Sequence, residues 1–476
     1  MEQPTEPGLP SSAGNFPDPT VGDSPFGSIA PPASAFGPPD APVIPRPTQT
    51  SERIEAIDVL RGLVLLGILL INIIGFGLPH WALWNPTVAG GHTGINWWAW
   101  FGAEVLVEGK MRALFSMLFG AGVILMTQRA EASGPEGRAR IADIYYRRML
   151  WLMVFGLIDA YLLCFVGDIL YDYALVGLLL FPLRKLRART LVIAGLCVLL
   201  GETGYRICKR DAHVAQRNEV FAIRAEKTAG IAITDEQRDK LEEWQEQLAE
   251  YSPPAREIEE ELSMRRGGYL GMVVGQAGEV KGGHSWPVYL GADILSMMLI
   301  GMGLVRAGVM TGRRGKRLYM TMAVIGLPLG WTLAALPRLA GSGANFDPEF
   351  VAPFYASPAW TYPVQRLLGA LGYLGAVMLL ARAVSLRKIV RAIAITGRMP
   401  LTNYLGQSVI CLILFSGVGF GWVGELQRYQ LLLVAIAIWT VQVLFSVAWL
   451  GLWSFGPMEW LWRWLSYGER PRLLKA

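Results

Sequence analysis

Apolar stretches about as long as a bilayer-crossing helix follow one another along most of this chain. Their approximate limits are 57–78, 106–127, 149–166, 169–184, 189–206, 286–305, 318–337, 361–381, 394–418 and 429–455. Only a helix or a closed barrel can satisfy its backbone hydrogen bonds inside hydrocarbon. Stretches of this length therefore predict an all-α fold, a polytopic bundle of about ten transmembrane helices.

Positive charge alternates between successive connections, and this alternation predicts the orientation of the bundle. One set of connections is rich in Arg and Lys: Arg129, Arg138, Arg140, Arg147 and Arg148; Arg184, Lys185, Arg187 and Arg189; Arg306, Arg313, Arg314, Lys316 and Arg317; Arg382, Arg387, Lys388 and Arg391; and Arg463, Arg470, Arg472 and Lys475. The alternate connections are nearly free of both, since residues 79–97 have none and 338–360 and 419–428 have one Arg each. The positive-inside rule predicts that both termini are cytoplasmic, which is consistent with an even number of spans.

Two segments lie outside the predicted spans. Residues 1–50 are rich in Pro, Gly and Ser and are predicted to be a disordered cytoplasmic tail. Residues 207–284 carry dense mixed charge and are predicted to be an extracytoplasmic helical segment, in which Thr234 and Gln237 form a capping box. The predicted organisation is a tail at 1–50, five spans in 52–206, the segment 207–284, and five spans in 285–474.

Composition agrees with a membrane protein and narrows the partners. The chain has 476 residues, of which 53% are hydrophobic and 17% charged, whereas soluble domains have about 25% charged residues. Its net charge of +5 follows from the basic connections and predicts no nucleic-acid partner. The predicted partners are the lipid bilayer and a small molecule of unknown identity. The four Cys and four His lack metal-ligand spacing, so no metal site and no bound cofactor are predicted.

Polar residues inside the apolar stretches are the first candidates for function, because a charge at the centre of a spanning helix costs roughly 2.5–3.5 kcal/mol. Asp159 lies near the middle of the third stretch, and Asp168 begins the fourth, where it is also a candidate helix cap. Asn403 and Gln407 are four residues apart and share one face of a helix without charges.

The first stretch carries three further candidates. Arg61 lies near its cytoplasmic end, and Asn72 lies about 16 Å deeper at 1.5 Å per residue. His80 ends the stretch at the outer face and is the best candidate for a general base, because imidazole titrates near neutral pH. The alternative is that a single interfacial His has a structural role.

Charges also gather where several stretches approach the outer face. Glu104, Glu108, Lys110 and Arg112 precede or begin the second stretch and predict either a polar vestibule or mutual salt bridges. Glu202, Asp293 and Arg366 lie toward the outer ends of their stretches, where we expect them to extend to the aqueous interface.

Five strings carry a family resemblance, and they occur in a fixed order. These are RIEAIDVLRGLVLLGILLINIIGFG, VEGKMRALFSMLFGAG, GDILYDYALVGLL, GRMPLTNYLGQS and GPMEWLWRWLSYG. Together they resemble the YeiB-like family of bacterial inner-membrane proteins, a domain of unknown function, over residues 52–474. The resemblance implies a multi-pass protein of the bacterial inner membrane. Members of that family generally have a His in the third span, where this chain has Asp159.

The YeiB-like family is in turn distantly similar to transmembrane acyltransferases, which transfer an acyl group from cytoplasmic acyl-CoA to an extracytoplasmic acceptor. This similarity implies that Arg61 attracts the acyl-CoA, that Asn72 lines its path, and that His80 deprotonates the acceptor. Glu108 or Asp168 would orient His80, and Asp159 is a further catalytic candidate. The remaining candidates for substrate binding are Glu108, Lys110, Arg112, Arg398, Asn403 and Gln407.

Two other functions remain open from the sequence. In a secondary transporter, Asp159, Asn403 and Gln407 would form a polar site near the membrane midplane, with proton coupling through Asp159. In a scaffold or assembly factor, the same polar residues would only join helices to one another.

Overall fold

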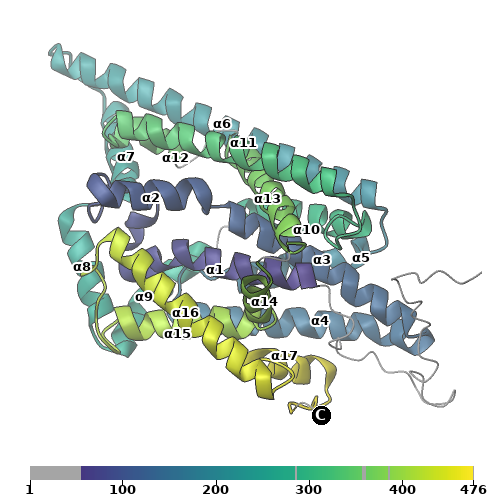
Figure 1. The fold of residues 1–476 in the computed structure, drawn as a ribbon. Coiled ribbons are helices and arrows are strands. Elements are labelled where there is room, and N and C mark those ends of the chain that lie inside the picture. The colour runs from purple at the N-terminus through teal and green to yellow at the C-terminus, as the bar shows by residue number, and fades with distance from the viewer. Residues whose placement is uncertain (1–54, 285–286, 356–360, 384–385, 475–476) are drawn as a thin grey trace, which may run out of the picture. The chain divides into compact units, whose positions relative to one another are not determined.

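The computed structural model describes residues 55–284, 287–355, 361–383 and 386–474, and these residues are almost entirely helical (Figure 1). Their β-structure is limited to one isolated bridge between Trp453 and Leu474. The predicted all-α class is confirmed. The tail predicted at 1–50 lies outside the described residues.

Each predicted apolar stretch contains a helix. The helices are α1 (Glu55–Gly77), α3 (Lys110–Ala132), α4 (Pro135–Leu157), α5 (Leu170–Leu183), α6 (Ala188–Thr228), α10 (Pro287–Arg306), α11 (Lys316–Gly343), α13 (Thr361–Leu380), α15 (Pro400–Phe415) and α16 (Arg428–Leu452). Among the described residues, six helical segments are long and apolar enough to cross a membrane, and α5 and α15 are shorter apolar helices. The chain thus has the helices of a multi-pass membrane protein, while the total of ten spans and the position of the termini stay predictions.

Shorter helices and turns connect or flank these elements. They are the turn η2 (His80–Leu83), α2 (Gly94–Leu106), the π-helical turn η3 (Ile158–Leu162), α7 (Asp235–Tyr251), α8 (Ala255–Arg266), α9 (Tyr269–His284), α12 (Pro348–Tyr355), α14 (Arg387–Thr396) and α17 (Pro457–Tyr467). The capping box predicted at Thr234 and Gln237 is present at the start of α7. Trp244 and Tyr251 on the apolar face of this helix are buried.

Several boundaries differ from the prediction, among them that of the third stretch, predicted at 149–166, whose helix α4 begins at Pro135 and ends at Leu157. The fifth stretch is predicted to end near residue 206, but α6 continues to Thr228, and the sequence has no Gly or Pro between residue 206 and Gly230. The single stretch 394–418 is divided, since α14 ends at Thr396 and α15 begins at Pro400. Proline is favoured in the first turn of a helix, where its missing N–H costs nothing.

Glycines allow several of these helices to pack backbone against backbone. A Cβ added to Gly120 of α3 would lie 2.1 Å from the carbonyl oxygen of Met298, and one added to Gly301 of α10 would lie 2.1 Å from that of Met117. The same kind of contact joins α11 to α13 at Gly326, Gly330 and Gly372. Close approach through small residues is a main source of helix association in lipid, where apolar burial gives little net drive.

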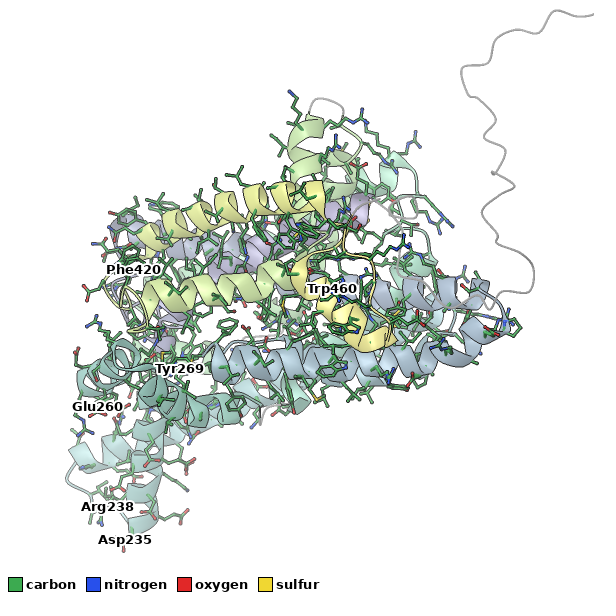
Figure 2. All side chains as sticks on the ribbon, turned by 90° about the horizontal axis from the view of Figure 1, so that it is seen from below. Asp235, Arg238, Glu260, Tyr269, Phe420 and Trp460 are labelled. Atoms are coloured by element: carbon green, nitrogen blue, oxygen red, sulfur yellow. The ribbon has the colours of Figure 1, made fainter. Side chains whose placement is uncertain are left out.

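Of the three connections that are poor in Lys and Arg, residues 79–97 contact both of the others. Asn96 Nδ2 donates to Gln427 Oε1 at 3.1 Å, and Trp97 Nε1 donates to Ser342 Oγ at 3.2 Å. In addition, the Gly424 amide donates to the carbonyl oxygen of Gly77 at the end of α1. We call this side of the bundle the His80 end. Figure 2 shows Phe420 at this end of α15 and α16, and Trp460 of α17 toward the other.

At the opposite end, α17 closes the start of α15. The Glu459 carboxylate accepts hydrogen bonds from the backbone amides of Leu401 and Thr402, at 2.6 and 3.0 Å, and from the Thr402 hydroxyl at 2.5 Å. A Cβ on Gly456 would lie 2.2 Å from this carboxylate, so only glycine leaves room for it. The two signature strings near the C-terminus therefore form one unit, in which an acidic side chain caps a helix N-terminus.

A matched pair of substitutions in α3 tests the glycine contacts. Gly120→Ala should lower stability by about 1–3 kcal/mol, because the added methyl meets a backbone carbonyl that cannot rotate away. Gly122 has nothing within 4 Å of its Cβ position, so Gly122→Ala should be neutral or stabilise the helix by about 0.5–1 kcal/mol. Thermal unfolding of the purified protein in detergent measures both. Equal effects of the two changes would contradict the packing described here.

Candidate functional site

A cavity of about 330 Å³ opens among α1, α3, α4, α5, α15 and α17. Its lining on α3 runs from Arg129 back to Phe115, which is about 21 Å along the helix at 1.5 Å per residue. Five arginines line it: Arg61, Arg129, Arg148, Arg398 and Arg463. We call this side of the bundle the basic end. The deeper lining is mostly apolar, with Phe115, Leu118, Phe119 and Val123 from α3 and Leu152 from α4.

Positive charge exceeds negative charge around this cavity. Its acidic lining residues are Asp58 and Glu459, and Glu459 is occupied as the cap of α15. Arg61 donates to Asp58 Oδ1 at 3.1 Å and to the carbonyl oxygen of Gly397 at 3.3 Å. The buried Arg398 Nε has no hydrogen-bond partner among the described residues. Two predicted binding residues, Arg61 and Arg398, therefore line one cavity whose net charge favours an anionic ligand.

Tyr404 lies where the inner lining of the cavity meets a buried carboxyl group. Its hydroxyl lies 3.3 Å from Asp168 Oδ1, while its side chain also lines the cavity. The same Asp168 carboxylate accepts hydrogen bonds from the backbone amides of Leu170 and Tyr171, both at 3.1 Å. The prediction that Asp168 caps the fourth span is confirmed.

Asp159 lies next to this group, in the π-helical turn η3 at the end of α4. Its side chain is fully buried, and neither carboxylate oxygen has a hydrogen-bond partner in the described part of the chain. Asp168 and Ser408 are the polar side chains close enough to affect the protonation of Asp159. The structure thus brings together two of the three predicted catalytic residues, and π-helical turns often mark functional sites.

His80, the third predicted catalytic residue, pairs with a residue that the sequence did not single out. Its Nδ1 lies 3.0 Å from Glu261 Oε2, and its backbone amide lies 3.1 Å from both oxygens of the same carboxylate. The expected partners Glu108 and Asp168 both make other contacts. Burial acts to raise the pKa of Glu261, but hydrogen bonds from His80 and the charge of Arg265 hold this pKa below its usual value. An ionised Glu261 accepts the Nδ1 proton and leaves Nε2 as the basic nitrogen.

Arg265 fixes this pair to the end of α1. Its guanidinium donates to the carbonyl oxygens of Leu78 at 2.9 Å and Gly75 at 3.1 Å, and also to that of Phe76. It also contacts Glu261 one turn earlier on α8, at 3.1 Å. Helix α8 therefore both caps the C-terminus of α1 and positions the carboxylate that holds His80.

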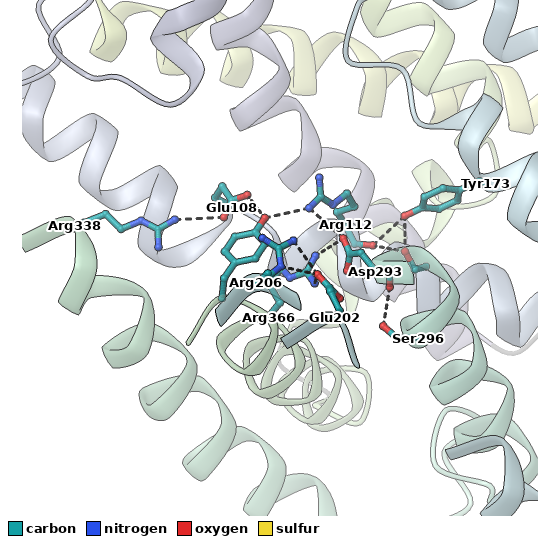
Figure 3. Close-up of polar contacts among 11 residues, drawn as sticks. Glu108, Arg112, Tyr173, Glu202, Arg206, Asp293, Ser296, Arg338 and Arg366 are labelled. Carbon is teal, nitrogen blue, oxygen red and sulfur yellow. Dashed lines mark hydrogen bonds and ion pairs between the residues drawn. The ribbon is translucent and has the colours of Figure 1, made fainter. Parts of the chain in front are cut away.

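The charges at the start of the second stretch form buried ion pairs (Figure 3). Arg338 of α11 donates to Glu104 at 2.8 Å and approaches Glu108 at 3.5 Å. The Tyr362 hydroxyl donates to Glu108 at 2.8 Å and accepts from Arg112 at 3.0 Å. Of the two readings of this cluster, mutual salt bridges are what the structure contains.

The ion pairs continue across three further helices (Figure 3). Asp293 of α10 pairs with Arg366 and, at 3.2 Å, with Arg112, and Glu202 pairs with Arg206 at 2.8 Å. The expectation that Glu202, Asp293 and Arg366 extend to the interface is wrong, because all three are buried and find partners between helices. Lys110 is also buried, and its Nζ donates to the carbonyl oxygens of Glu104 and Glu108 at 3.3 and 3.2 Å.

Asn403 and Gln407 join helices and do not line the cavity. Asn403 Nδ2 donates to Ser446 Oγ at 3.0 Å, and Gln407 Nε2 donates to Gln442 Oε1 at 3.0 Å. Gln442 Nε2 in turn donates to the Asn403 carbonyl oxygen at 2.7 Å, so the amides form a ladder between α15 and α16. Asn72 is half-buried on α1, and within the described residues no hydrogen bond joins it to this ladder or to Asp159.

Comparison with known proteins agrees with the resemblance of the five strings. A family model described as a protein of unknown function (DUF418) matches residues 304–469. The chain is 31% identical over 432 residues to the uncharacterized protein YeiB of Escherichia coli (strain K12), covering 87% of this chain and 96% of YeiB. It belongs to the DUF418 family. It is also 28% identical over 447 residues to the uncharacterized protein YxaH of Bacillus subtilis (strain 168), covering 89% of this chain and 96% of YxaH. No solved structure matches the chain.

Substitutions at the Arg338–Glu104 pair test whether the ion network holds the DUF418 bundle together. Arg338→Met should cost about 3–5 kcal/mol, because it leaves a buried carboxylate without its counter-charge. Adding Glu104→Gln should recover part of this loss, since the unpaired charge is then removed. Thermal unfolding of both variants gives the coupling. Additive effects would show that the two side chains do not depend on each other.

Proposed function

We propose that this DUF418 protein is a bacterial inner-membrane acyltransferase. It takes an acyl group from acyl-CoA at the basic end and transfers it to an acceptor at the His80 end. By the positive-inside rule the basic end faces the cytoplasm, where acyl-CoA is made. The observation that carries the proposal is the cavity, which combines an excess of arginine with an apolar interior.

Acyl-CoA matches this cavity in both charge and polarity. Its phosphates are anionic, and arginine binds phosphate oxygens through paired N–H groups. Among the described residues, Arg398 has an unpartnered Nε and Arg61 pairs with the single carboxylate of Asp58, so both have donors to offer. The pantetheine arm with its thioester would then extend along the apolar lining of α3 toward Tyr404.

At the His80 end, His80 and Glu261 supply the general base. His80 Nε2 takes the proton of an acceptor hydroxyl or amine, and Glu261 stabilises the imidazolium through Nδ1. The acceptor atom attacks the thioester carbonyl, the carbon–sulfur bond breaks, and the coenzyme A thiolate leaves and takes up a proton.

The segment 163–169 contacts both the end of α1 that precedes His80 and the Tyr404 side chain of the cavity lining. Phe165 stacks on Phe76 of α1 with ring centroids 4.5 Å apart, four residues before His80. At its other end the segment carries Asp168, which binds Tyr404 of the cavity lining. In the proposed reaction this segment moves aside to bring the thioester to the base.

Arg398 tests the donor site. Arg398→Ala should weaken acetyl-CoA binding about 10- to 100-fold, because a charge-assisted hydrogen bond contributes about 1.5–3 kcal/mol. Arg140→Ala is the matched control, since Arg140 is an exposed arginine outside the cavity lining. Equilibrium binding of labelled acetyl-CoA to the purified protein measures the difference. Unchanged binding in the Arg398 variant would remove this residue from the donor site.

His80 tests the chemistry. His80→Ala should lower transfer from labelled acetyl-CoA by about 10²–10⁴-fold while donor binding stays unchanged, because the base acts only on the acceptor. Glu261→Gln should lower it less, since the imidazole remains but loses its carboxylate partner. His92→Ala, at an exposed position, should have no effect. Activity that survives His80→Ala would exclude this residue as the base.

A further inference from the structure

We infer that Asp159 and Asp168 form a proton-binding pair, which holds one proton between two carboxyl groups and exchanges it with water in the basic-end cavity through the Tyr404 hydroxyl. The inference goes beyond acyl transfer, because it requires no donor or acceptor. It would equally provide the coupling site of a transporter.

The first step of the argument is the absence of a counter-charge. Within the described residues, no Lys, Arg or His forms an ion pair with Asp159 or Asp168. The other buried carboxylates discussed above each have a cation or several backbone amides as partners. The titratable and polar groups that interact electrostatically with the two carboxyls are Asp172 of α5 and Tyr404, Ser408 and Cys411 of α15. None of these carries positive charge.

The second step concerns hydrogen bonds. Asp168 accepts two backbone amides and the Tyr404 hydroxyl, which is the environment of an ionised carboxylate. Neither oxygen of Asp159 makes a hydrogen bond of good geometry in the part of the chain that the structure describes; the nearby Ser408 hydroxyl is a potential donor, and the Asp159 side chain is fully buried. A carboxylate buried in this way pays the full cost of lost hydration, whereas the protonated acid does not. Asp159 is therefore the member of the pair that carries the proton.

The third step is the backbone geometry that links the two acids, since the Phe165 amide donates to the Asp159 carbonyl oxygen and the Asp168 amide donates to that of Phe165, both at 3.1 Å. The π-helical turn Ile158–Leu162 interrupts the regular helix at Asp159. On the preceding turn, a Cβ added to Gly156 would lie 2.7 Å from Asp168 Oδ2, so glycine is needed there for the second carboxylate to approach. Two carboxylates held close together and away from water do not both ionise readily.

The fourth step is access. Tyr404 lines the cavity, and its hydroxyl lies 3.3 Å from Asp168 Oδ1. A proton from cavity water can pass to Asp168 by way of this hydroxyl and be shared with Asp159. On uptake, the pair changes from two negative charges to one, and release reverses the change.

Infrared difference spectroscopy on the purified full-length protein tests the inference. Between acidic and alkaline samples, the wild type should show the carbonyl band of a buried protonated carboxyl, and this band should persist at neutral pH. Asp159→Asn should remove it, and Tyr404→Phe should slow its exchange after a pH jump. Asp143→Asn, at an exposed position on α4, the helix that precedes η3, should leave the band unchanged. A band that is absent at neutral pH in the wild type, or that survives Asp159→Asn, would overturn the inference.

A second measurement needs no variant. A hydrophobic carbodiimide reacts with protonated carboxyls in apolar surroundings, so peptide mass spectrometry of treated wild-type protein should find the adduct on Asp159 or Asp168 at neutral pH. The labelling should decline as the pH rises. Adducts elsewhere but not at this pair would mean that both carboxyls are ionised. Both measurements are made without acyl-CoA, so failure of the acyl-transfer proposal would leave their outcome unchanged.

Discussion

The bundle depends on one constraint, which is that polar groups inside it must find their partners within the protein because lipid offers none. Glu104, Asp293 and Glu202 meet arginines from other helices, and the Asn403–Gln442 ladder joins α15 to α16. A buried ion pair adds little net stability compared with apolar residues of the same shape, but one left half-made is strongly destabilising. These contacts therefore specify which helices are neighbours more than they add to total stability.

The best candidates for functional groups are the buried polar atoms that lack a partner within the protein. In the described structure, an Arg398 nitrogen in the cavity is unpartnered, and the carboxylate of Asp159 in the π-helical turn has neither a cation nor a hydrogen bond of good geometry. The first departure lies in the cavity lining, and the second lies behind it, where Tyr404 of the lining contacts Asp168. In the two proposals, an anionic ligand supplies the partner of the arginine, and a proton neutralises the carboxylate.

The sequence alone predicts where the helices lie, but it does not predict which side chains pair between them. Long apolar stretches and Arg-poor connections are local signals, so the helix positions and the contact between the connections near Trp97 and Gln427 could be expected. The Asp168 cap could also be predicted, because it acts within three residues. Glu261 could not, since it lies 181 residues from His80 in a segment with many similar glutamates. The burial of Arg366 was missed for a related reason, as depth in a helix does not reveal whether an opposing Asp293 is present.

Both the N-terminal cap of α15 and part of the cavity wall come from a helix that is synthesised later. Helix α15 obtains the acceptors for its first backbone amides from α17, which follows α16 in the chain. The same helix α17 contributes Trp462, Arg463 and Tyr467 to the wall of the cavity. During synthesis the chain must therefore lay down α16 and return to the basic end before α15 is capped and this wall of the cavity is complete.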